Sequence, residues 1–303
     1  MKRLGFKWLY KKIEECYRRG KGIVELDLHG RRMLINAGNL YPLIIRWIPL
    51  FNLPLVSLVR EVHKKLGRPL TIIDCGAAVG DTAFLLDEQC PGAVGQMHCV
   101  DGEKEFLSIL RVNAPRLPFP IKIMDALLAR SAMKIPDLVR HHQGTASAVG
   151  GSQKIDATTL DLLFPATQPG EKIDLLKIDI DGYDGEALAG AVQLLRRDRP
   201  AVIFEWHPDL ILKAGNDPHA AFDALGGAGY RVFLAFHNTG LFSHFGANRR
   251  DNLDLWIKYL LHHQKNWDPH FDIIALPDEL EDIQLPVCCL GLSRPSSMTA
   301  PLR

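Results

Sequence analysis

The stretch from residue 71 to residue 81 constrains the fold more than any other part of this chain. It reads Thr-Ile-Ile-Asp-Cys-Gly-Ala-Ala-Val-Gly-Asp, an apolar run that passes directly into small residues and glycines, and a helix-compatible segment follows at 82–86. This order predicts a strand, a tight turn and the start of a helix. Gly76 and Gly80 allow a turn in which backbone N–H groups and a helix N-terminus approach a ligand closely. We therefore expect the first strand-to-helix corner of a nucleotide-type site.

The spacing of the glycines bears on which nucleotide this corner suits. The dinucleotide pattern G-x-G-x-x-G would require glycine at 76, 78 and 81, but the chain has Ala78 and Asp81, which disfavours a hydride carrier. The pattern Asp74-x-Gly76-x-x-x-Gly80 is instead similar to motif I of class I methyltransferases that use S-adenosylmethionine (SAM). In that family the acid at the strand end helps to fix the amino group of the ligand. An ordinary tight turn of another α/β protein is the alternative.

Acidic residues also end the next two predicted strands. Strand 96–100 ends at Asp101-Gly102, and strand 121–124 ends at Asp125-Ala126. An acid about 20 residues beyond a glycine turn can accept both ribose hydroxyls of an adenosine ligand, in SAM and NAD sites alike. The alternative role for Asp101 is an N-cap for a helix at 103–113. Adenine would lie near Asp125 and Ala126.

A second group of polar residues follows the fourth and fifth predicted strands. The buried strand 173–178 leads to Asp179 and Asp181, and the strand 200–204 leads to Glu205 and His207, with an amphipathic helix at 184–197 between them. In open parallel sheets, ligands bind in the crevice beyond the carboxyl ends of the strands. All these side chains are therefore expected to face one crevice.

Taken in order, the motifs of the chain resemble a known family. They are Ile73 to Gly80, Asp101 with Asn113, Ala126-Leu127, Leu176 to Gly182, Glu186, Leu188, Gly190-Ala191, Arg199-Pro200 and Glu205. This set spans residues 70 to 208 and resembles the FkbM-type methyltransferases, with weaker similarity through strands at 230–234 and 271–277. The chain departs from the family at Asp101-Gly102, where Glu-Pro is common, and at Asp181, where Glu is usual.

The resemblance implies a fold, a cofactor and a reaction. The fold is the class I (Rossmann-like) arrangement, a seven-stranded, mostly parallel sheet flanked by helices with an antiparallel final strand. The reaction is SAM-dependent O-methylation of a hydroxyl on a sugar, glycan or lipid-linked saccharide. The residues expected to bind SAM are Asp74, Gly76, Ala77, Ala78, Gly80, Asp101, Gly102, Asp125 and Ala126.

Methyl transfer to an alcohol requires alignment of the acceptor oxygen and removal of its proton. We expect His207 or Asp179 to accept that proton, with Asp181 and Glu205 orienting the hydroxyl. The alternatives are structural: Asp179 caps the next helix, and His207 only ends a strand. No metal site is expected, although a divalent cation held by Asp179, Asp181 and Glu205 is a minority hypothesis.

The N-terminal part of the chain is strongly basic. Residues 1–70 hold 15 Lys and Arg against 5 Asp and Glu, and an amphipathic helix at 3–19, a hairpin at 23–35 and a helix at 55–66 are predicted there. We expect a basic helix-plus-hairpin cap at 1–69, a SAM-binding domain at 70–278 and a partly disordered tail at 279–303. The cap is either a solvated surface or a peripheral contact with an anionic membrane or a lipid-linked substrate.

Composition limits the remaining possibilities. The six cysteines show no zinc-like spacing, and the most apolar window, 41–59, is interrupted by Arg46 and two prolines. A cytoplasmic protein with reduced thiols is expected, peripheral at the inner face of the membrane if the cap binds lipid. Beyond the cap the chain is acidic, with 21 Lys and Arg against 30 Asp and Glu, so nucleic acid is not an expected partner.

The sequence leaves three other functions possible. They are methylation of a secondary-metabolite (polyketide-like) hydroxyl, NAD-dependent oxidation of a sugar, and a non-catalytic scaffold that binds a partner through residues 1–70.

The segment 236–270 is expected to place a helix at 253–263 over or beside the acceptor pocket.

Overall fold

The computed structural model describes residues 20–142, 145–148, 152–165, 172–247, 249–264 and 269–285. The predicted helix at 3–19 and most of the predicted tail, residues 286–303, lie outside these ranges. No helix of the described part is long and apolar enough to cross a membrane.

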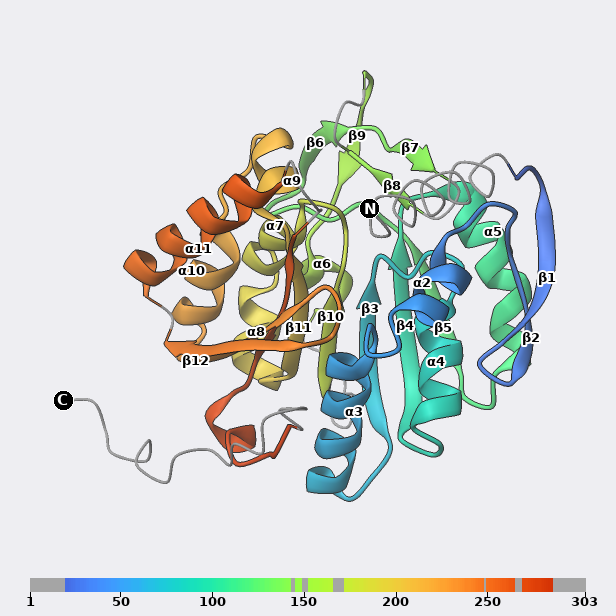
Figure 1. Ribbon diagram of the computed structural model, residues 1–303, viewed down its shortest axis with the longest axis horizontal. Coiled ribbons are helices and arrows are strands. Elements are labelled where there is room, and N and C mark those ends of the chain that lie inside the picture. Colours follow the sequence, from blue (N-terminus) through green and yellow to red (C-terminus); the bar gives the residue numbers. More distant parts are fainter. Residues whose placement is uncertain are drawn as a thin grey trace, which may run out of the picture.

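A central sheet organises the described chain (Figure 1). Its order is β13-β12-β14-β11-β10-β3-β4-β5, in which β5, β4, β3, β10 and β11 are parallel neighbours and β14 runs antiparallel to both β11 and β12. The strands are β3 (Leu70–Cys75), β4 (Val94–Asp101), β5 (Ile121–Asp125), β10 (Leu175–Ile178), β11 (Ala201–Trp206), β12 (Val232–His237), β13 (Phe242–Ala247) and β14 (Phe271–Ala275). The mixed α/β fold with a mostly parallel sheet is thus confirmed.

Helices cover both faces of this sheet, because successive residues of a buried strand point to opposite sides. Ile72 packs with one set of helices, whereas its neighbour Ile73 packs with the other. The first set is α3 (Leu53–Leu66), α4 (Asp81–Gln89) and α5 (Lys104–Asn113). The second set is α6 (Leu160–Leu163), α7 (Asp184–Ala189), α8 (Val192–Asp198), α10 (Ala220–Gly227) and α11 (Arg250–His263). The short helix α9 (Pro208–Lys213) follows β11.

Smaller elements lie beyond the sheet. The N-terminal hairpin is β1 (Ile23–Leu28) with β2 (Arg31–Asn36), and it is followed by the short helix α2 (Tyr41–Trp47). Buried Asn113 binds this hairpin to the glycine turn: its amide exchanges hydrogen bonds with the backbone of Leu34 and also donates to the carbonyl of Val79. Two further hairpins, β6 (Met133–Pro136) with β9 (Lys154–Ala157) and β7 (Val139–His142) with β8 (Thr145–Ser147), connect β5 to α6.

Three expectations need correction. The sheet has eight described strands, because β13 adds an antiparallel edge strand from the segment read only as a helix region. The helix predicted at 184–197 is two helices, which are separated at Gly190 and Ala191. A Cβ on Gly190 would stand 2.4 Å from the carbonyl oxygen of Ala129, so this position requires glycine. The cap contains α2, which was not predicted; the hairpin and the helix ending at Gly67 agree with the structure.

Candidate active site

The turn after β3 requires glycine at residue 76, because the backbone at the end of β10 occupies the space that a side chain would fill. Gly76 has a φ of 80°, and a Cβ at this position would lie 1.8 Å from the carbonyl oxygen of Asp179 at the end of β10. Gly80, with a φ of 93°, precedes α4, and Ala78 between them also has a positive φ, 44°. The turn is thereby fixed where β3 and β10 end side by side.

Asp101 ends β4 beside this turn. Its carboxylate accepts hydrogen bonds from the backbone N–H groups of Ala78 and Glu103, each at 2.8 Å. Burial raises the pKa of Asp101 to about 6, although both hydrogen bonds lower it. Helix α5 is capped by the side chain of Glu103, so the alternative role of Asp101 as its N-cap is wrong. Each carboxylate oxygen keeps a lone pair for a further donor.

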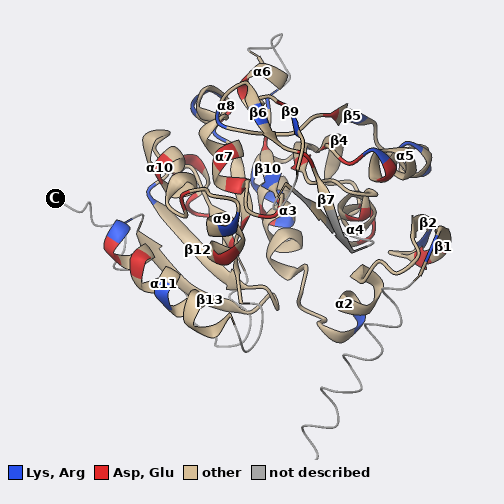
Figure 2. Cartoon of the chain, turned by 90° about the horizontal axis from the view of Figure 1, so that it is seen from above, with Lys and Arg blue, Asp and Glu red and all other residues tan. Residues whose placement is uncertain are grey.

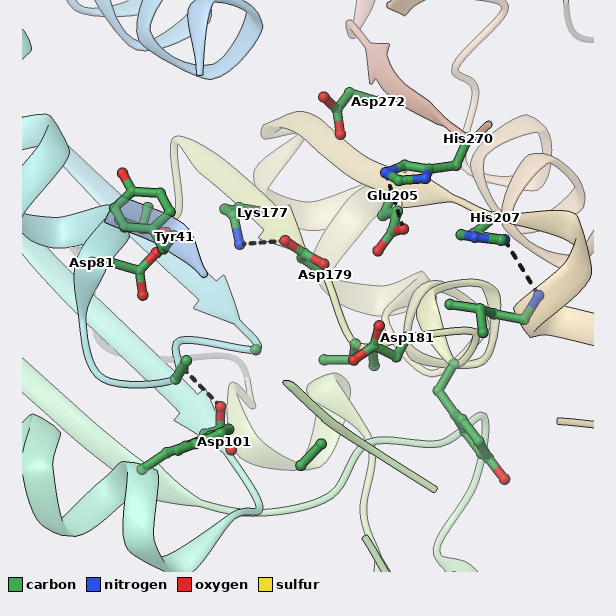
Figure 3. Close-up of a pocket in the computed structure, with 18 of the residues that line it drawn as sticks. Tyr41, Asp81, Asp101, Lys177, Asp179, Asp181, Glu205, His207, His270 and Asp272 are labelled. Carbon is green, nitrogen blue, oxygen red and sulfur yellow. Dashed lines mark hydrogen bonds and ion pairs between the residues drawn. The ribbon is translucent and has the colours of Figure 1, made fainter. Parts of the chain in front are cut away.

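A cavity of about 660 Å³ opens beyond the strand ends (Figure 3). This volume lies within the range of small-molecule and cofactor sites. The predicted residues that line it are Gly76, Ala78, Asp101, Gly102, Ala126, Asp179, Asp181, Glu205 and His207. The structure therefore brings both predicted groups into one space, the nucleoside residues at one end and the strand-end acids at the other.

Four of the residues expected to bind cofactor lie outside the lining. Ala77 is buried. A Cβ on Gly80 would collide with the side chain of Leu110 on α5, so the glycine at 80 allows this part of the turn to pack against α5. Asp125 pairs with Lys104 at the start of α5. Asp74 is fully buried beneath the cavity floor.

Lys177 separates Asp74 from the cavity. Its Nζ lies 3.0 Å from Oδ1 of Asp74 and 3.4 Å from Oδ2 of Asp179. Burial alone would lower the pKa of Lys177, but the two carboxylates outweigh it and hold the pKa above its ordinary value. Oδ2 of Asp74 has no hydrogen-bond partner in the described part of the chain. Lys177 is therefore the charged group that the cavity presents above Asp74.

Asp179 and Glu205 form a carboxyl pair at the ends of β10 and β11. Burial raises the pKa of Glu205 well above its ordinary value, and the charges of Asp179 and Asp181 add to this effect. The pKa of Asp179 is lowered: burial opposes its ionisation, but Lys177 and a hydrogen bond with Glu205 outweigh burial. The two pKa shifts are opposite in direction, so Glu205 is the group of the pair that keeps a proton more readily and Asp179 is the group that ionises more readily.

The turn after Asp179 is shaped by Asp184. The carboxylate of Asp184 accepts the backbone N–H groups of Ile180 and Gly182 at 3.2 and 3.1 Å, and Asp181 adopts a left-handed φ of 49°. Burial and the charge of Asp179 raise the pKa of Asp184 to about 7. It is Asp184, not Asp179, that holds this turn, so Asp179 and Asp181 are left facing the cavity.

His207 differs from expectation in its proton arrangement. The backbone N–H of Leu210 donates to Nδ1 of His207 at 3.4 Å, which caps α9. A neutral imidazole that accepts at Nδ1 carries its proton on Nε2. His207 therefore acts as the N-cap of α9 and also lines the cavity.

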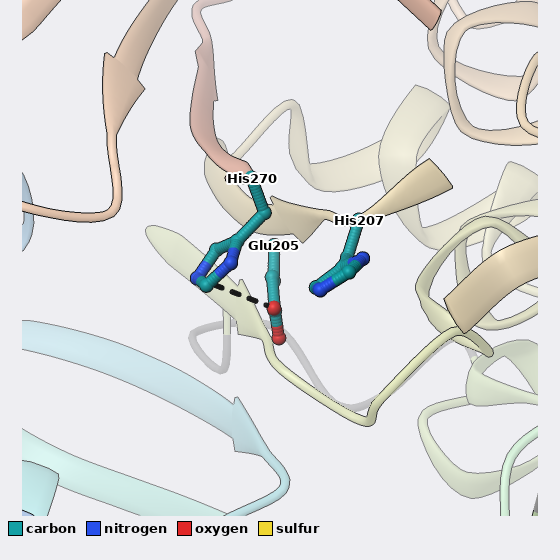
Figure 4. Close-up of side chains that lie close together, drawn as sticks. All are labelled: Glu205, His207 and His270. Atoms are coloured by element: carbon teal, nitrogen blue, oxygen red, sulfur yellow. Dashed lines mark ion pairs between the residues drawn. The ribbon is translucent and has the colours of Figure 1, made fainter. Parts of the chain in front are cut away.

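Glu205, His207 and His270 approach one another closely (Figure 4). Their potential ligand atoms all lie within 4.8 Å, and the two imidazole rings stack at 5.0 Å between centroids. Nε2 of His270 lies 3.4 Å from Oε1 of Glu205. A metal ion would need the lone pair of Nε2 of His207, whereas the contact with Leu210 places a proton there. The arrangement favours a hydrogen-bonded group over a metal site.

Five residues that line the cavity were not predicted from the sequence as site residues: Tyr41, Asp81, Lys177, His270 and Asp272. Lys177 had a usable signal, because it lies two residues before Asp179 and so shares its side of the strand. Asp272 had none: it reaches the site because β14 pairs it with Glu205 across the sheet. Burial raises the pKa of Asp272 to about 7 and that of Asp81 to about 6.

Residues 102–232 match the sequence profile of a family described as the methyltransferase FkbM domain. No curated protein is significantly similar to the chain.

Solved structures with similar folds include methyltransferase FkbM from Methylobacillus flagellatus KT, at 15% identity and a TM-score of 0.43 over 68% of this chain. The chain spans 43% of the length of that protein. The plantazolicin methyltransferase BpumL in complex with SAH matches at 11% identity and a TM-score of 0.36, over 78% of this chain and 89% of BpumL. Precorrin-6y C5,15-methyltransferase from Geobacter metallireducens GS-15 matches at 13% identity and a TM-score of 0.35, over 71% of this chain and 85% of that one.

Proposed function

Because residues 102–232 match the profile of the methyltransferase FkbM domain, we propose that the chain transfers a methyl group from SAM to a hydroxyl of a sugar, glycan or lipid-linked saccharide. One observation carries the proposal: the glycine turn, Asp101 and the Asp179–Glu205 pair line the same cavity. A nucleoside-binding end and an acid–base end in one space suit a transfer between cofactor and acceptor.

The residues present fit SAM. Gly76 and Ala78 line the cavity, so the backbone of 76–78 can approach the ligand, and Asp101 keeps lone pairs for ribose hydroxyls. Gly102 and Ala126 line the adenine end, while Lys177 and Asp81 lie where the charged amino-acid part would be held. When bound, SAM supplies an activated methyl group on a sulfonium leaving group.

The Asp179–Glu205 pair is the proposed base. With one proton the pair carries one negative charge, and Lys177 stabilises that charge on Asp179. Loss of the shared proton at the raised pKa of Glu205 leaves two adjacent carboxylates, and such a pair readily takes a proton from an alcohol. Asp179 keeps the role expected for it, and Glu205 moves from orienting the hydroxyl to sharing the base.

Other side chains orient the acceptor hydroxyl. Asp181 lines the same wall as the pair, and His207 offers an N–H donor from the opposite side of Glu205 (Figure 3). An alcohol held between an acceptor and a donor has its oxygen lone pair directed into the cavity, where the methyl group is presented. No divalent cation is required in this scheme, because the carboxyl pair supplies the basicity.

Ligand titration tests the proposal. The full chain is titrated calorimetrically with SAM, S-adenosylhomocysteine (SAH) and NAD, and methyl incorporation from labelled SAM into sugars and glycans is then measured by mass spectrometry. Binding of the two sulfur ligands with transfer to an oxygen supports the proposal. Binding of NAD alone would favour the oxidoreductase, and binding of none would favour the scaffold. A cytoplasmic location, the absence of a nucleic-acid partner and membrane contact of the cap stay predictions.

A further inference from the structure

The cap presents an unusual apolar surface to the cavity. Six apolar residues at one helical spacing line it: Leu40, Leu43, Ile44, Trp47, Ile48 and Phe51. The spacing is that of the core-facing stripe of an amphipathic helix. Yet no residue of α2 is buried, and Trp47 is 39% exposed. This stripe, hereafter the α2 stripe, faces the cavity in place of a core.

The α2 stripe is uncharged, and α2 carries one charged residue, Arg46, which is exposed and lies outside the lining (Figure 2). Ile45, on the other side of the helix, packs against the core, so α2 has a fixed orientation with its stripe toward the cavity. A row of apolar side chains that stays partly exposed along a cavity wall is typical of a binding site.

The far end of the cavity has the opposite character. Four carboxyl side chains line it, those of Asp179, Asp181, Glu205 and Asp272, against Lys177, which is already paired with Asp74 and Asp179. Even with one proton shared between Asp179 and Glu205, carboxylates are in excess. A phosphate or carboxylate on the acceptor would be repelled there.

From these two ends we propose that the acceptor is an uncharged amphiphile, whose hydroxyl meets the Asp179–Glu205 pair and whose apolar portion packs on the α2 stripe. This inference rests on the proposed function and narrows its substrate class. Saccharides that carry phosphate near the reacting sugar are excluded by it, whereas a neutral glycoside with an alkyl or aryl group fits. The apolar stripe and the acidic end belong to one cavity, so a single molecule can span both.

Binding of neutral and anionic probes to the full chain tests the inference. With SAH at saturation, octyl β-D-glucopyranoside below its micellar concentration, methyl β-D-glucopyranoside and octyl phosphate are titrated calorimetrically. The octyl glucoside is expected to bind at least about tenfold more tightly than the methyl glucoside, since burial of two methylene groups already accounts for that ratio. Octyl phosphate is expected to bind more weakly than octyl glucoside.

Two substitutions locate the effect. Ile44→Asn and Trp47→Ala are expected to remove most of the preference for the octyl chain while SAH still binds, which also reports that the variants are folded. Leu255→Asn, at an equally apolar residue of α11 that is 66% exposed and outside the lining, should keep the preference.

The outcomes distinguish failure of the inference about the acceptor from failure of the proposed function. Tight SAH binding with equal affinity for both glucosides, a preference unchanged in Ile44→Asn and Trp47→Ala, or tighter binding of octyl phosphate would overturn the inference alone. Absence of SAH binding would overturn the proposed function and this inference with it.

Discussion

Asp179 and Glu205, at the carboxyl ends of neighbouring strands β10 and β11, lie close enough to share a hydrogen bond, and the pKa of Glu205 is raised while that of Asp179 is lowered. The two strands are parallel, so their ends meet at one edge of the sheet and bring the two carboxyl groups together. Together they form a site whose last proton leaves at a raised pKa.

Glu205→Gln tests this pair directly. The amide can still donate to Asp179 but cannot ionise, so kcat should fall by about 10²–10⁴, the usual contribution of a positioned base. In the wild type, kcat should rise as the pH increases through the raised pKa, because the ionised pair is the base. That rise should disappear in the variant. SAH affinity should not change, and Glu279→Gln, at an exposed glutamate paired with Arg199, should leave the whole profile intact.

Asp101→Ala should weaken SAH binding about tenfold or more, because a hydrogen bond to a charged group contributes about 1.5–3 kcal/mol. Asp125→Ala is the matched control, since Asp125 ends the adjacent strand β5 but pairs with Lys104 outside the cavity. Calorimetric titration of both variants measures the difference. Equal losses in the two would show that Asp101 has no direct role in binding the ligand.

Gly76→Ala should destabilise the fold more than a positive φ alone explains. Gly215 has nearly the same φ, 79° against 80°, but open space around its missing Cβ. Gly215→Ala should therefore cost about 1–2 kcal/mol of unfolding free energy, from the left-handed backbone only. Gly76→Ala should cost about 1–3 kcal/mol more, from the collision with the Asp179 carbonyl. Urea unfolding of both variants gives the comparison, and equal losses would contradict the packing account.

Asp272 should make the ligand-free protein less stable as the pH rises. Its pKa is about 7 in the folded chain against 3.8 ordinarily, so between these values the folded state holds a proton that the unfolded state has lost. The free energy of unfolding should therefore fall from pH 5 to pH 7 by up to about 1.4 kcal/mol per pH unit from this group. Asp272→Asn should reduce that slope. Asp156→Asn, at an exposed position, should not.

Chelation should leave methyl transfer unchanged. His207 spends its Nδ1 lone pair on the N–H of Leu210, so Glu205 and His270 remain as the only two ligands of that group of three. Two ligands hold a divalent cation poorly. Activity is measured after dialysis against EDTA. Loss of rate that Zn²⁺ or Mg²⁺ restores would show that a cation takes part and that His207 adopts another tautomer.

The sequence predicted the parts of the site that depend on local pattern. The glycine turn, Asp101 and the acids after β10 and β11 follow from apolar runs that end in polar residues, and they face one cavity as expected. Asp74 fits the same pattern, yet it is fully buried and does not line the cavity, because its register partner Lys177 on β10 shares its side of the sheet, pairs with it and lines the cavity instead.

The features of the fold and site that were not predicted depend on pairing between strands far apart in the sequence. Asp272 lies opposite Glu205 only through the antiparallel register of β11 and β14, which no local spacing encodes. Strand β13 contains Gly246 and two phenylalanines, Phe242 and Phe245, and all its residues are partly exposed, so its pattern lacks the alternation of a buried strand. Tyr41 reaches the cavity from the cap, where its hydroxyl meets His29 at 2.7 Å and Asn52 at 3.0 Å.

The position of β14 between β11 and β12 also determines the order in which parts of the sheet can pair while the chain is being synthesised. Strands β3, β4 and β5 end by residue 125, so the nucleoside end of the cavity can form early from contiguous chain. Strands β11 and β12 acquire their common neighbour only when residues 271–275 have emerged, and His270 and Asp272 arrive with them. The growing chain therefore holds two unpaired strand edges until residues 271–275 are made, and such edges are prone to associate with other chains.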